Sequence, residues 1–338
     1  MRKALFAAFA VIFVFVACTP SQPPAPSDTA SGTPTAAEIA APKPTTEGKV
    51  KVAFVTNNSS DFWAIAEAGT KKAAEELGCE VLFRRPATNS AQEQQQIMED
   101  LIVNGVSGIA ISPNDPQNLT EILNGFAKQV NLITQDSDAP ESERLCYLGT
   151  NNYDAGKAAG EFIKKVLPNG GKVMLFVGRI DAQNAQDRRK GIEDTLAGSK
   201  ITILGTRTDE TDRAKSIANV QDTLVTNPDV ACLVGLWSYN GPAILNGVRD
   251  SGKLGQVKIV AFDEEPETLQ GIVDGHIEGT IVQQPYEFGY QSVKLLVQLA
   301  KNDKSGVPES KQIFIPVRTI TKAEVEEFSK TLREQIGK

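Results

Sequence analysis

The chain has 338 residues, of which 41% are hydrophobic and 23% are charged, so it is long enough for about two globular domains with buried cores. Its formal net charge is −7 at neutral pH. Because binding to nucleic-acid phosphates needs a basic face, this acidic balance argues against a nucleic-acid partner.

The N-terminus has the layout of a secretory signal. Arg2 and Lys3 precede a continuous apolar run that is too short to span a membrane comfortably. The run ends in "FVAC", which resembles the lipobox of bacterial lipoproteins, although Phe15 stands where Leu or Val is usual. Residues 1–18 are therefore predicted to be a lipoprotein signal peptide, with Cys18 as the lipidated first residue of the mature chain.

The next segment, residues 19–48, is rich in Pro, Ser, Thr and Ala and has no core-forming pattern. This composition is typical of a linker. We expect it to tether a globular part to a lipid anchor, which predicts a location in the periplasm or cell envelope.

Short β-rich segments alternate with amphipathic helices in the first part of the globular region. The pattern predicts strands at 50–56, 80–84, 107–112 and 130–134, and helices at 62–77, 90–104 and 116–128. Ser90 and Glu93 are spaced as a capping box, and Gly78 ends the first helix. Strands and helices that alternate in this way indicate a parallel sheet covered on both faces.

The same order of elements begins again after residue 171. It predicts strands at 172–178, 201–206, 230–235 and 257–262, and helices at 184–198, 212–226, 240–251 and 266–274. The remaining segment, with a helix from Ala323, is too short for a third domain, so we expect it to complete the two halves. The predicted fold class is α/β, with two doubly wound parallel-sheet lobes.

The motifs of common α/β enzymes are absent from the sequence. The loop after the first strand has no glycine, so it cannot form the GxGxxG turn, and GxxxxGK[ST] and GxSxG do not occur. Acidic residues that follow strands could act as general acids or bases, but they serve equally well as hydroxyl acceptors: Asp136, Asp138, Asp263, Glu264 and Glu265. We therefore expect no enzyme activity, no catalytic residues and no cofactor.

Cysteine and histidine usage gives no sign of a metal site. Cys79, Cys146 and Cys232 lie beside or inside apolar segments, which favours buried free thiols, with a Cys79–Cys146 disulfide as the alternative. The only histidine, His276, lies in a predicted turn. No metal is expected.

Polar and aromatic side chains gather where the predicted strands end. The hydrogen-bonding groups are Asn57, Asp136, Asn152, Gln186, Asp263 and Gln283, and the flat surfaces are Phe62, Trp63, Trp237 and Tyr239. In open α/β sheets, ligands bind at the carboxyl ends of the strands. A sugar has C–H faces that pack on aromatic rings and a rim of hydroxyls that need donors and acceptors, so this set of side chains favours a sugar.

Over nearly all of residues 49–320 the sequence resembles the type I periplasmic sugar-binding proteins, the ribose-binding family. The resemblance rests on motifs in the family's order, including "KVAFVTNNSSDFWAIAEAG", "NLITQDSDA", "YLGTNNYDAG", "NAQDRRKG" and "IVAFDEEPETLQGIVDGHIEGTIVQQP". It implies ligand contacts from ten residues: Asn57, Ser60, Phe62, Trp63, Asp136, Asn152, Gln186, Trp237, Asp263 and Gln283.

Three positions depart from the ribose binders of this family. Ser137 and Gln186 stand where the family usually has Arg, and Trp237 stands where it has Asn. Two acids with fewer cationic partners make plain ribose doubtful, and a bulkier sugar, a cyclitol or an amine-bearing ligand fits at least as well. Arg188 is expected to be a structural salt-bridge partner that could also reach the ligand.

The resemblance implies capture of a ligand between two lobes that close around a hinge. The N-terminal lobe is expected at 49–151 plus 284–311, and the C-terminal lobe at 152–283 plus 312–338. The closed monomer would deliver its ligand to a membrane permease of an ABC importer. A receptor that feeds a chemotaxis or kinase sensor remains the alternative, whereas a repressor is disfavoured because a signal and tether replace a helix-turn-helix.

Overall fold

The computed structural model describes residues 48–58, 60, 62–88 and 90–337. The predicted signal peptide, with Cys18, and nearly all of the predicted tether lie outside the described residues. In the part of the chain that is described, no helix is both long enough and apolar enough to cross a membrane.

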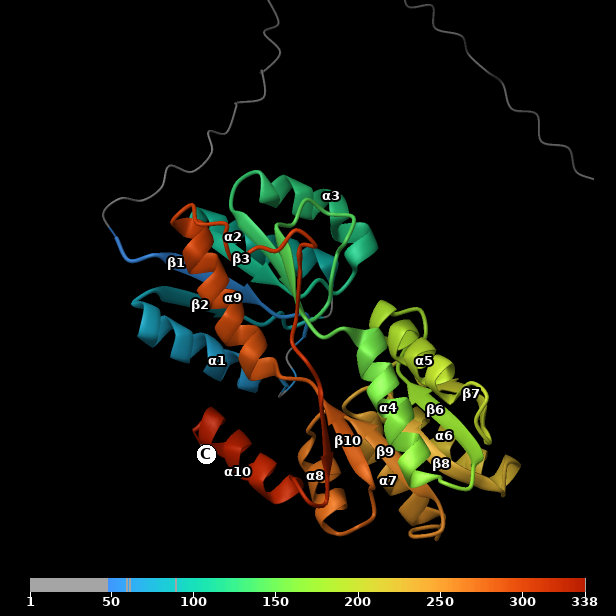
Figure 1. The fold of residues 1–338 in the computed structure, drawn as a ribbon. Helices are drawn as coiled ribbons and strands as arrows, with labels where there is room; N and C mark the ends of the chain where they lie inside the picture. Colours follow the sequence, from blue (N-terminus) through green and yellow to red (C-terminus); the bar gives the residue numbers. More distant parts are fainter. Residues whose placement is uncertain (1–47, 59, 61, 89, 338) are drawn as a thin grey trace, which may run out of the picture. The chain divides into compact units, whose positions relative to one another are not determined.

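The first lobe, in which Figure 1 labels β1, β2 and β3, is built on one parallel sheet. Its six strands lie in the order β11-β5-β4-β3-β1-β2. Helices cover both faces of this sheet, α1 and α9 on one and α2 and α3 on the other. The strands are β1 (Lys51–Val55), β2 (Glu80–Arg84), β3 (Gly108–Ile111), β4 (Asn131–Gln135), β5 (Cys146–Gly149) and β11 (Gln312–Phe314). The helices are α1 (Phe62–Leu77), α2 (Ala91–Val103), α3 (Pro116–Ala127) and α9 (Pro285–Ala300).

The second lobe repeats this plan with the order β12-β10-β9-β8-β6-β7. One face packs on α4 and α5, and the other on α6, α7, α8 and α10. The strands are β6 (Gly171–Val177), β7 (Ile201–Thr208), β8 (Val230–Gly235), β9 (Lys258–Phe262), β10 (Gly279–Val282) and β12 (Arg318–Thr321). The helices are α4 (Asn152–Val166), α5 (Gln183–Leu196), α6 (Arg213–Thr226), α7 (Asn240–Asp250), α8 (Pro266–Val273) and α10 (Val325–Ile336).

The two sheets therefore share one strand order, in which β4 and β9 hold equivalent positions, as do β5 and β10. The edge strands differ, since β11 is parallel to β5 whereas β12 is antiparallel to β10. The predicted fold class, two doubly wound α/β lobes, is confirmed.

The chain passes between the lobes at three places: after β5, after β10, and between β11 and β12. The predicted lobe boundary at residues 311/312 is wrong. Gln312–Phe314 pairs with β5 in the first sheet, so the third passage lies at residues 315–317. A three-residue strand gives too little periodicity to be assigned to a sheet from its sequence.

The last helix, α10, touches both lobes. Val325 is buried in the core of the second lobe, and Phe328 and Leu332 pack against that core. The same helix contacts α1 of the first lobe. The C-terminal segment therefore does more than complete the second lobe.

Local sequence signals account for several helix ends. The Ser90 side chain accepts a hydrogen bond from the backbone N–H of Glu93 at 3.2 Å, as the capping box predicts. The Glu93 carboxylate, however, accepts from the backbone N–H groups of Ala87 and Thr88, each at 2.7 Å, so it stabilises the preceding turn rather than Ser90. Gly78 has a φ of +64°, the left-handed conformation that commonly ends a helix.

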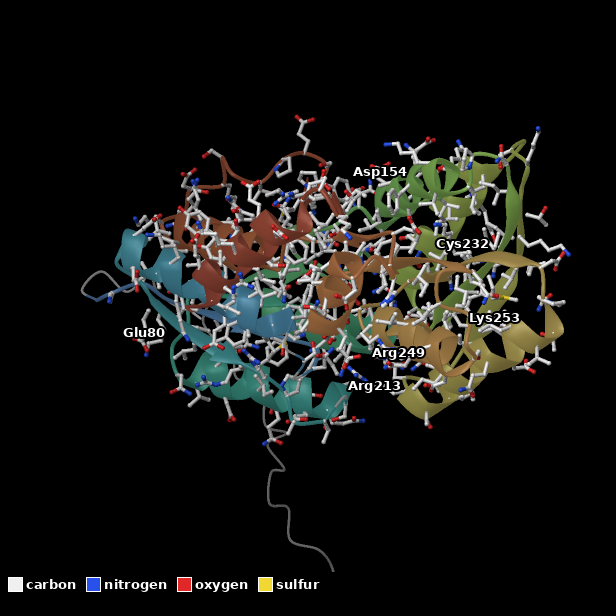
Figure 2. All side chains as sticks on the ribbon, turned by 90° about the horizontal axis from the view of Figure 1, so that it is seen from below. Glu80, Asp154, Arg213, Cys232, Arg249 and Lys253 are labelled. Carbon is white, nitrogen blue, oxygen red and sulfur yellow. The ribbon has the colours of Figure 1, made fainter. Side chains whose placement is uncertain are left out.

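The three cysteines of the globular part are buried free thiols, and the alternative Cys79–Cys146 disulfide is not formed. Cys232 lies inside the second lobe (Figure 2). Burial raises the pKa of Cys79 and Cys232 and that of Cys146 to about 11. These thiols are therefore protonated at neutral pH and act as small apolar side chains.

Glycines allow neighbouring helices to pack backbone to backbone. A Cβ added to Gly69 of α1 would lie 2.0 Å from the Tyr286 carbonyl oxygen of α9, and one added to Gly289 of α9 would lie 2.0 Å from the Ala66 carbonyl oxygen. A backbone atom cannot move aside as a flexible side chain can. The α1–α9 pair therefore depends on glycine at both positions.

We predict that Gly289→Ala lowers the free energy of unfolding by about 2 kcal/mol or more, because α1 and α9 must separate to admit the methyl group. The matched control is Gly125→Ala in α3, where a Cβ would meet no atom within 4 Å. That change should be stabilising by up to about 1 kcal/mol, owing to its helix propensity. Urea denaturation measures both, and equal effects of the two substitutions would contradict the packing argument.

Candidate ligand-binding site

Two aspartates occupy equivalent positions at the carboxyl ends of strands in the two lobes. Asp136 follows β4 and Asp263 follows β9, which are equivalent strands of the two sheets. Both residues have left-handed backbones, with φ of +59° and +64°. This conformation is costly for residues other than glycine and is concentrated at functional sites.

Each aspartate is held in this conformation by the strand that follows it. Its backbone N–H donates to a carbonyl of that strand, and its own carbonyl accepts a hydroxyl from the second residue of the same strand. For Asp136 the partners are Leu148 at 3.2 Å and Tyr147 at 2.9 Å, and for Asp263 they are Ile281 at 2.9 Å and Thr280 at 2.7 Å. The same arrangement has thus formed twice with different hydroxyl side chains.

Hydroxyl and amide groups surround the Asp136 carboxylate. Its Oδ2 accepts from Ser112 Oγ at 2.9 Å and from Asn57 Nδ2 at 3.4 Å. Burial raises the pKa of Asp136 to about 6, and the charge of Asp263 also raises it, whereas Ser112 and Arg188 oppose the rise. The two lobes therefore bring their aspartates close enough to interact.

The carboxylate of Asp263 lies deeper, with 5% of the residue exposed. Its Oδ1 accepts from Gln283 Nε2 at 3.0 Å, and Gln283 directly follows β10 at a passage between the lobes. Burial raises the pKa of Asp263, while the positive charge of Arg188 and the hydrogen bond from Gln283 lower it.

Arg188 of α5 is a buried cation on which the charges of both carboxylates act, with 2% of the residue exposed. Its Nε donates to Asn152 Oδ1 at 2.9 Å, its Nη1 donates to the Leu236 carbonyl at 2.7 Å, and its guanidinium lies 4.5 Å from the centre of the Phe262 ring. Burial lowers its pKa, and the charges of both aspartates raise it. Among the described residues the expected salt bridge is not formed, because these hydrogen bonds go to an amide and a backbone carbonyl.

The adjacent aromatic residues Phe62 and Trp63 have different environments. Only 1% of Trp63 is exposed, because its ring packs edge-on against Phe54 in the core, and its Nε1 donates to Asn58 Oδ1 at 3.2 Å. Phe62 is only partly buried and stands perpendicular to Trp63. The expectation that both rings contact a ligand is therefore corrected: the structure places Trp63 in the core and leaves surface on Phe62.

Trp237 follows β8 as a fixed, partly exposed plate. A Cβ at Gly178 would lie 2.2 Å from its ring, so the indole rests directly on that glycine. Its Nε1 donates to Asn184 Oδ1 at 3.2 Å, and its ring meets Tyr239 edge-on, while Tyr239 hydrogen-bonds Asp209. Because the indole N–H is already engaged, Trp237 can offer a ligand only the surface of its ring.

Two predicted site residues, Gln186 and Ser60, make hydrogen bonds to groups other than the two aspartates. Gln186 is exposed in the first turn of α5, and its Nε2 donates to the Asp181 carbonyl at 3.2 Å. Ser60 is exposed, and its backbone N–H donates to Asn58 Oδ1 at 2.8 Å. Asn57, Asn152 and Gln283 do lie within the aspartate and arginine network.

Sequence reasoning missed Ser112 and the hydroxyl of Tyr147. Ser112 follows β3 just as Asp136 follows β4, so its position at a strand end was a usable signal. The role of Tyr147 had no such signal, because it depends on the left-handed turn at Asp136. Among the described residues, no cluster of three or more His, Cys, Asp or Glu side chains is placed to hold a metal ion.

The raised pKa of Asp136 predicts a pH dependence of stability. Between its ordinary pKa of 3.8 and its folded value of about 6, the folded state binds more protons than the unfolded state. The free energy of unfolding must therefore fall as pH rises through this window. Asp136→Asn removes the effect, so the stability of this variant relative to the wild type should increase from pH 4 to pH 6.5 and then level off.

Urea denaturation of the ligand-free protein at steps of pH measures this difference. Asp250→Asn, which changes an exposed carboxylate at the end of α7, is the control and should show no such increase over the same range. A stability difference for Asp136→Asn that is independent of pH would refute the assignment.

The comparisons with known proteins agree with this geometry. The model of the periplasmic binding protein domain family matches residues 52–304. The ribose import binding protein of Escherichia coli K12 is 27% identical over 252 residues, which cover 74% of this chain and 84% of that protein.

Solved structures share the fold over most of the chain. An ABC transporter solute-binding protein from Burkholderia graminis, solved in complex with D-arabinose, is 32% identical with a TM-score of 0.76, covering 81% of this chain and 96% of that one. The XylFII–LytSN complex contains a chain that is 26% identical with a TM-score of 0.72, covering 81% and 98%. This chain therefore belongs to the periplasmic binding protein family, as a member of its type I, ribose-binding-like group of sugar-binding proteins.

Proposed function

We propose that this protein is the extracytoplasmic receptor of an ABC importer and that it captures a sugar or sugar-like polyol between its two lobes. The observation that carries the proposal is the pair of aspartates at equivalent strand ends, one from each lobe, around a single buried arginine. Carboxylates accept hydrogen bonds from the hydroxyls of a sugar, and a guanidinium donates hydrogen bonds to the oxygens of those hydroxyls. A ligand with hydroxyls on opposite edges can satisfy both lobes at once.

The proposed contacts divide between the lobes. Polar contacts from the first lobe come from Asp136 and Asn57, and those from the second from Asp263, Gln283 and Asn152, with Arg188 added to the predicted set. Phe62 and Trp237 supply ring surfaces for the C–H faces of the ligand. Ser60 and Gln186 are exposed, so we assign them to the rim. The names of the relatives include ribose and D-arabinose, which supports a monosaccharide of about the size of a pentose as the ligand.

Capture requires rotation of the lobes but no bond making or breaking in the ligand, so the proposed role is not enzymatic. Only three segments join the lobes, and Gln283 in one of them also binds the Asp263 carboxylate. A ligand that contacts both aspartates favours the closed state by its differential affinity. We further propose that the closed monomer is recognised by the permease of the importer.

Two alternatives have specific support. The XylFII–LytSN complex is an assembly of a similar chain with another protein, which favours a sensory role for this one as the second candidate function.

The second alternative concerns the ligand. The positive charge of an amine-bearing sugar would be attracted by two carboxylates that lie near only one buried guanidinium, since Ser137 and Gln186 supply no further positive charge. The ligand screen below separates this ligand class from neutral sugars.

We predict that a neutral monosaccharide raises the melting temperature of the anchor-free protein. A ligand at 100 times its Kd stabilises the folded state by about 2.7 kcal/mol. The screen includes D-ribose, D-arabinose, D-xylose, D-allose, D-tagatose, myo-inositol and D-glucosamine. A shift with glucosamine alone would favour an amine-bearing ligand, and a shift with nucleotides but no polyol would rule out the proposal.

Asp263→Ala should weaken the identified ligand about 10- to 100-fold, because a hydrogen bond to a charged group contributes about 1.5–3 kcal/mol. Asp250→Ala removes an exposed carboxylate from the same lobe and should leave the affinity unchanged. Isothermal titration calorimetry measures both variants. Full affinity in Asp263→Ala would refute the assigned site.

We also propose that Cys18 anchors the protein to a membrane by its lipid, as the "FVAC" motif indicates. Cys18→Ser should move the exported protein from the membrane fraction to the soluble fraction. Immunoblots of fractionated cells measure the shift. Continued membrane fractionation of the variant would argue against lipidation at this residue.

A further inference from the structure

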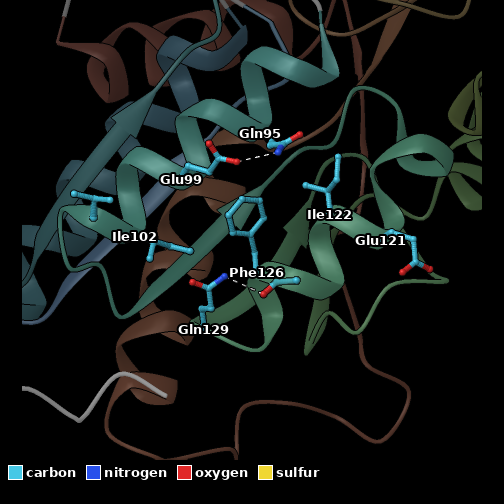
Figure 3. A pocket seen from close by; sticks show the side chains of 9 residues that line it. Gln95, Glu99, Ile102, Glu121, Ile122, Phe126 and Gln129 are labelled. Atoms are coloured by element: carbon cyan, nitrogen blue, oxygen red, sulfur yellow. Dashed lines mark hydrogen bonds between the residues drawn. The ribbon is translucent and has the colours of Figure 1, made fainter. Parts of the chain in front are cut away.

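A groove runs between α2 and α3 on the outer surface of the first lobe (Figure 3). Its volume is about 390 Å³, and its apolar lining includes Ile102 of α2 and Ile122 and Phe126 of α3. Figure 3 shows the Phe126 ring between the two helices. Val103 at the end of α2 also lines the groove and is 88% exposed, the highest value among the exposed large hydrophobic residues of the described chain.

Gly125 in this groove differs from the other helical glycines of the described residues, because it has no close neighbour at the position of a Cβ. At every other one, an added Cβ would lie within 3.0 Å of a neighbouring atom, so close packing explains the glycine: Gly69, Gly156, Gly160, Gly191, Gly241, Gly247, Gly271 and Gly289. At Gly125, a Cβ would meet nothing within 4 Å. Glycine within a helix costs about 1 kcal/mol relative to alanine. No close contact with the described residues accounts for that cost at Gly125.

The equivalent helix pair of the second lobe has no such open glycine. There, α6 and α7 pack closely, because Gly247 admits Val220, and a Cβ at Gly247 would lie 2.7 Å from that side chain. Gly125 holds the equivalent position in the α2–α3 pair, but there an added Cβ would meet no atom of the described residues within 4 Å. The comparison shows that Gly125, unlike Gly247, has open space where its Cβ would stand, as far as the described residues go.

The charges on the two helices are of one sign. Together, α2 and α3 carry four acidic side chains and no lysine or arginine: Glu93, Glu99, Asp100 and Glu121. Two of them, Glu99 and Glu121, line the groove from opposite helices. In contrast, α6 and α7 carry both signs, with Arg213 and Arg249 labelled in Figure 2. The groove thus combines an apolar floor with an acidic rim.

We propose that the α2–α3 groove binds a basic amphipathic segment of a partner protein. An apolar side chain of the partner would pack on Gly125 and on the exposed Val103, and its lysine or arginine side chains would pair with Glu99 and Glu121. An anionic lipid surface is disfavoured as the occupant, because it would be repelled by the acidic rim. This surface is separate from the aspartate site and does not depend on which ligand that site takes.

The first experiment is a peptide titration with the purified protein. The probe is a synthetic amphipathic helix of leucine and lysine, about as long as α2, and its binding is followed by fluorescence at two salt concentrations. Gly125→Leu puts a side chain into the groove at a position where the Cβ meets no described atom within 4 Å. It should weaken binding of the probe at least tenfold while the melting temperature is retained or raised. Glu99→Lys with Glu121→Lys should weaken it as much and remove the salt dependence.

The matched control is Glu141→Lys with Glu309→Lys, which makes the same change in net charge at exposed sites outside α2 and α3. These substitutions should leave probe binding within about twofold of wild type, as expected of distant surface charges. Equal weakening by both charge-reversal pairs, or no effect of Gly125→Leu, would show binding to net charge alone and overturn the proposal.

The second experiment identifies the occupant in cells that express the full chain. A photo-reactive benzoylphenylalanine replaces Val103, or Val225 of α6, a valine of similar exposure at 79% that serves as the control. The proposal would be supported by cross-linking from position 103 to a segment rich in lysine or arginine. This cross-link should be absent from position 225, and Gly125→Leu should abolish it. Products with lipid alone, or only with a second copy of this chain, would overturn it.

Discussion

The structure depends on holding two carboxylates of like charge in one partly dehydrated region with a single guanidinium. Burial raises the pKa of both Asp136 and Asp263, and their proximity adds to the effect on Asp136. Both residues also carry left-handed backbones, which are costly without glycine. Their geometry persists because the following strand holds each one through its N–H and its carbonyl.

This constraint depends on how the surrounding elements are packed. The aspartates can face one another only if β4, β5, β9 and β10 keep their register, and those strands are held between helix layers on both faces. Glycines at Gly69 and Gly289 bring α1 and α9 into backbone contact beneath one sheet. Each lobe is thus packed on both faces of its sheet, and the movement that we propose is assigned to the three connecting segments. At Gly125, by contrast, an added Cβ would meet no atom of the described residues, and it is there that we propose a contact with a partner protein.

Predictions succeeded where they rested on local patterns. The helix at 62–77 matched its observed bounds, because an amphipathic run ends there at Gly78 in a left-handed conformation. Asp136 and Asp263 were found because a polar residue directly after a buried strand lies at a sheet edge. Trp63 was assigned to the ligand site although it packs in the core, since adjacent aromatics in sequence do not reveal which ring turns inward. The burial of Arg188 was likewise out of reach, because its partners Asn152 and Leu236 are distant along the chain.

The sequence by itself determined the α/β class, the two repeated halves and the family, and it predicted most of the polar residues of the candidate site. These features follow from short-range periodicity and from motifs that are continuous along the chain. Only the tertiary structure decided that the charges of both aspartates act on one buried guanidinium, that Gln312–Phe314 belongs to the first sheet, and that Gly125 faces an open groove with acidic side chains. Each of these depends on distances between residues far apart in sequence, and no local pattern encodes such distances.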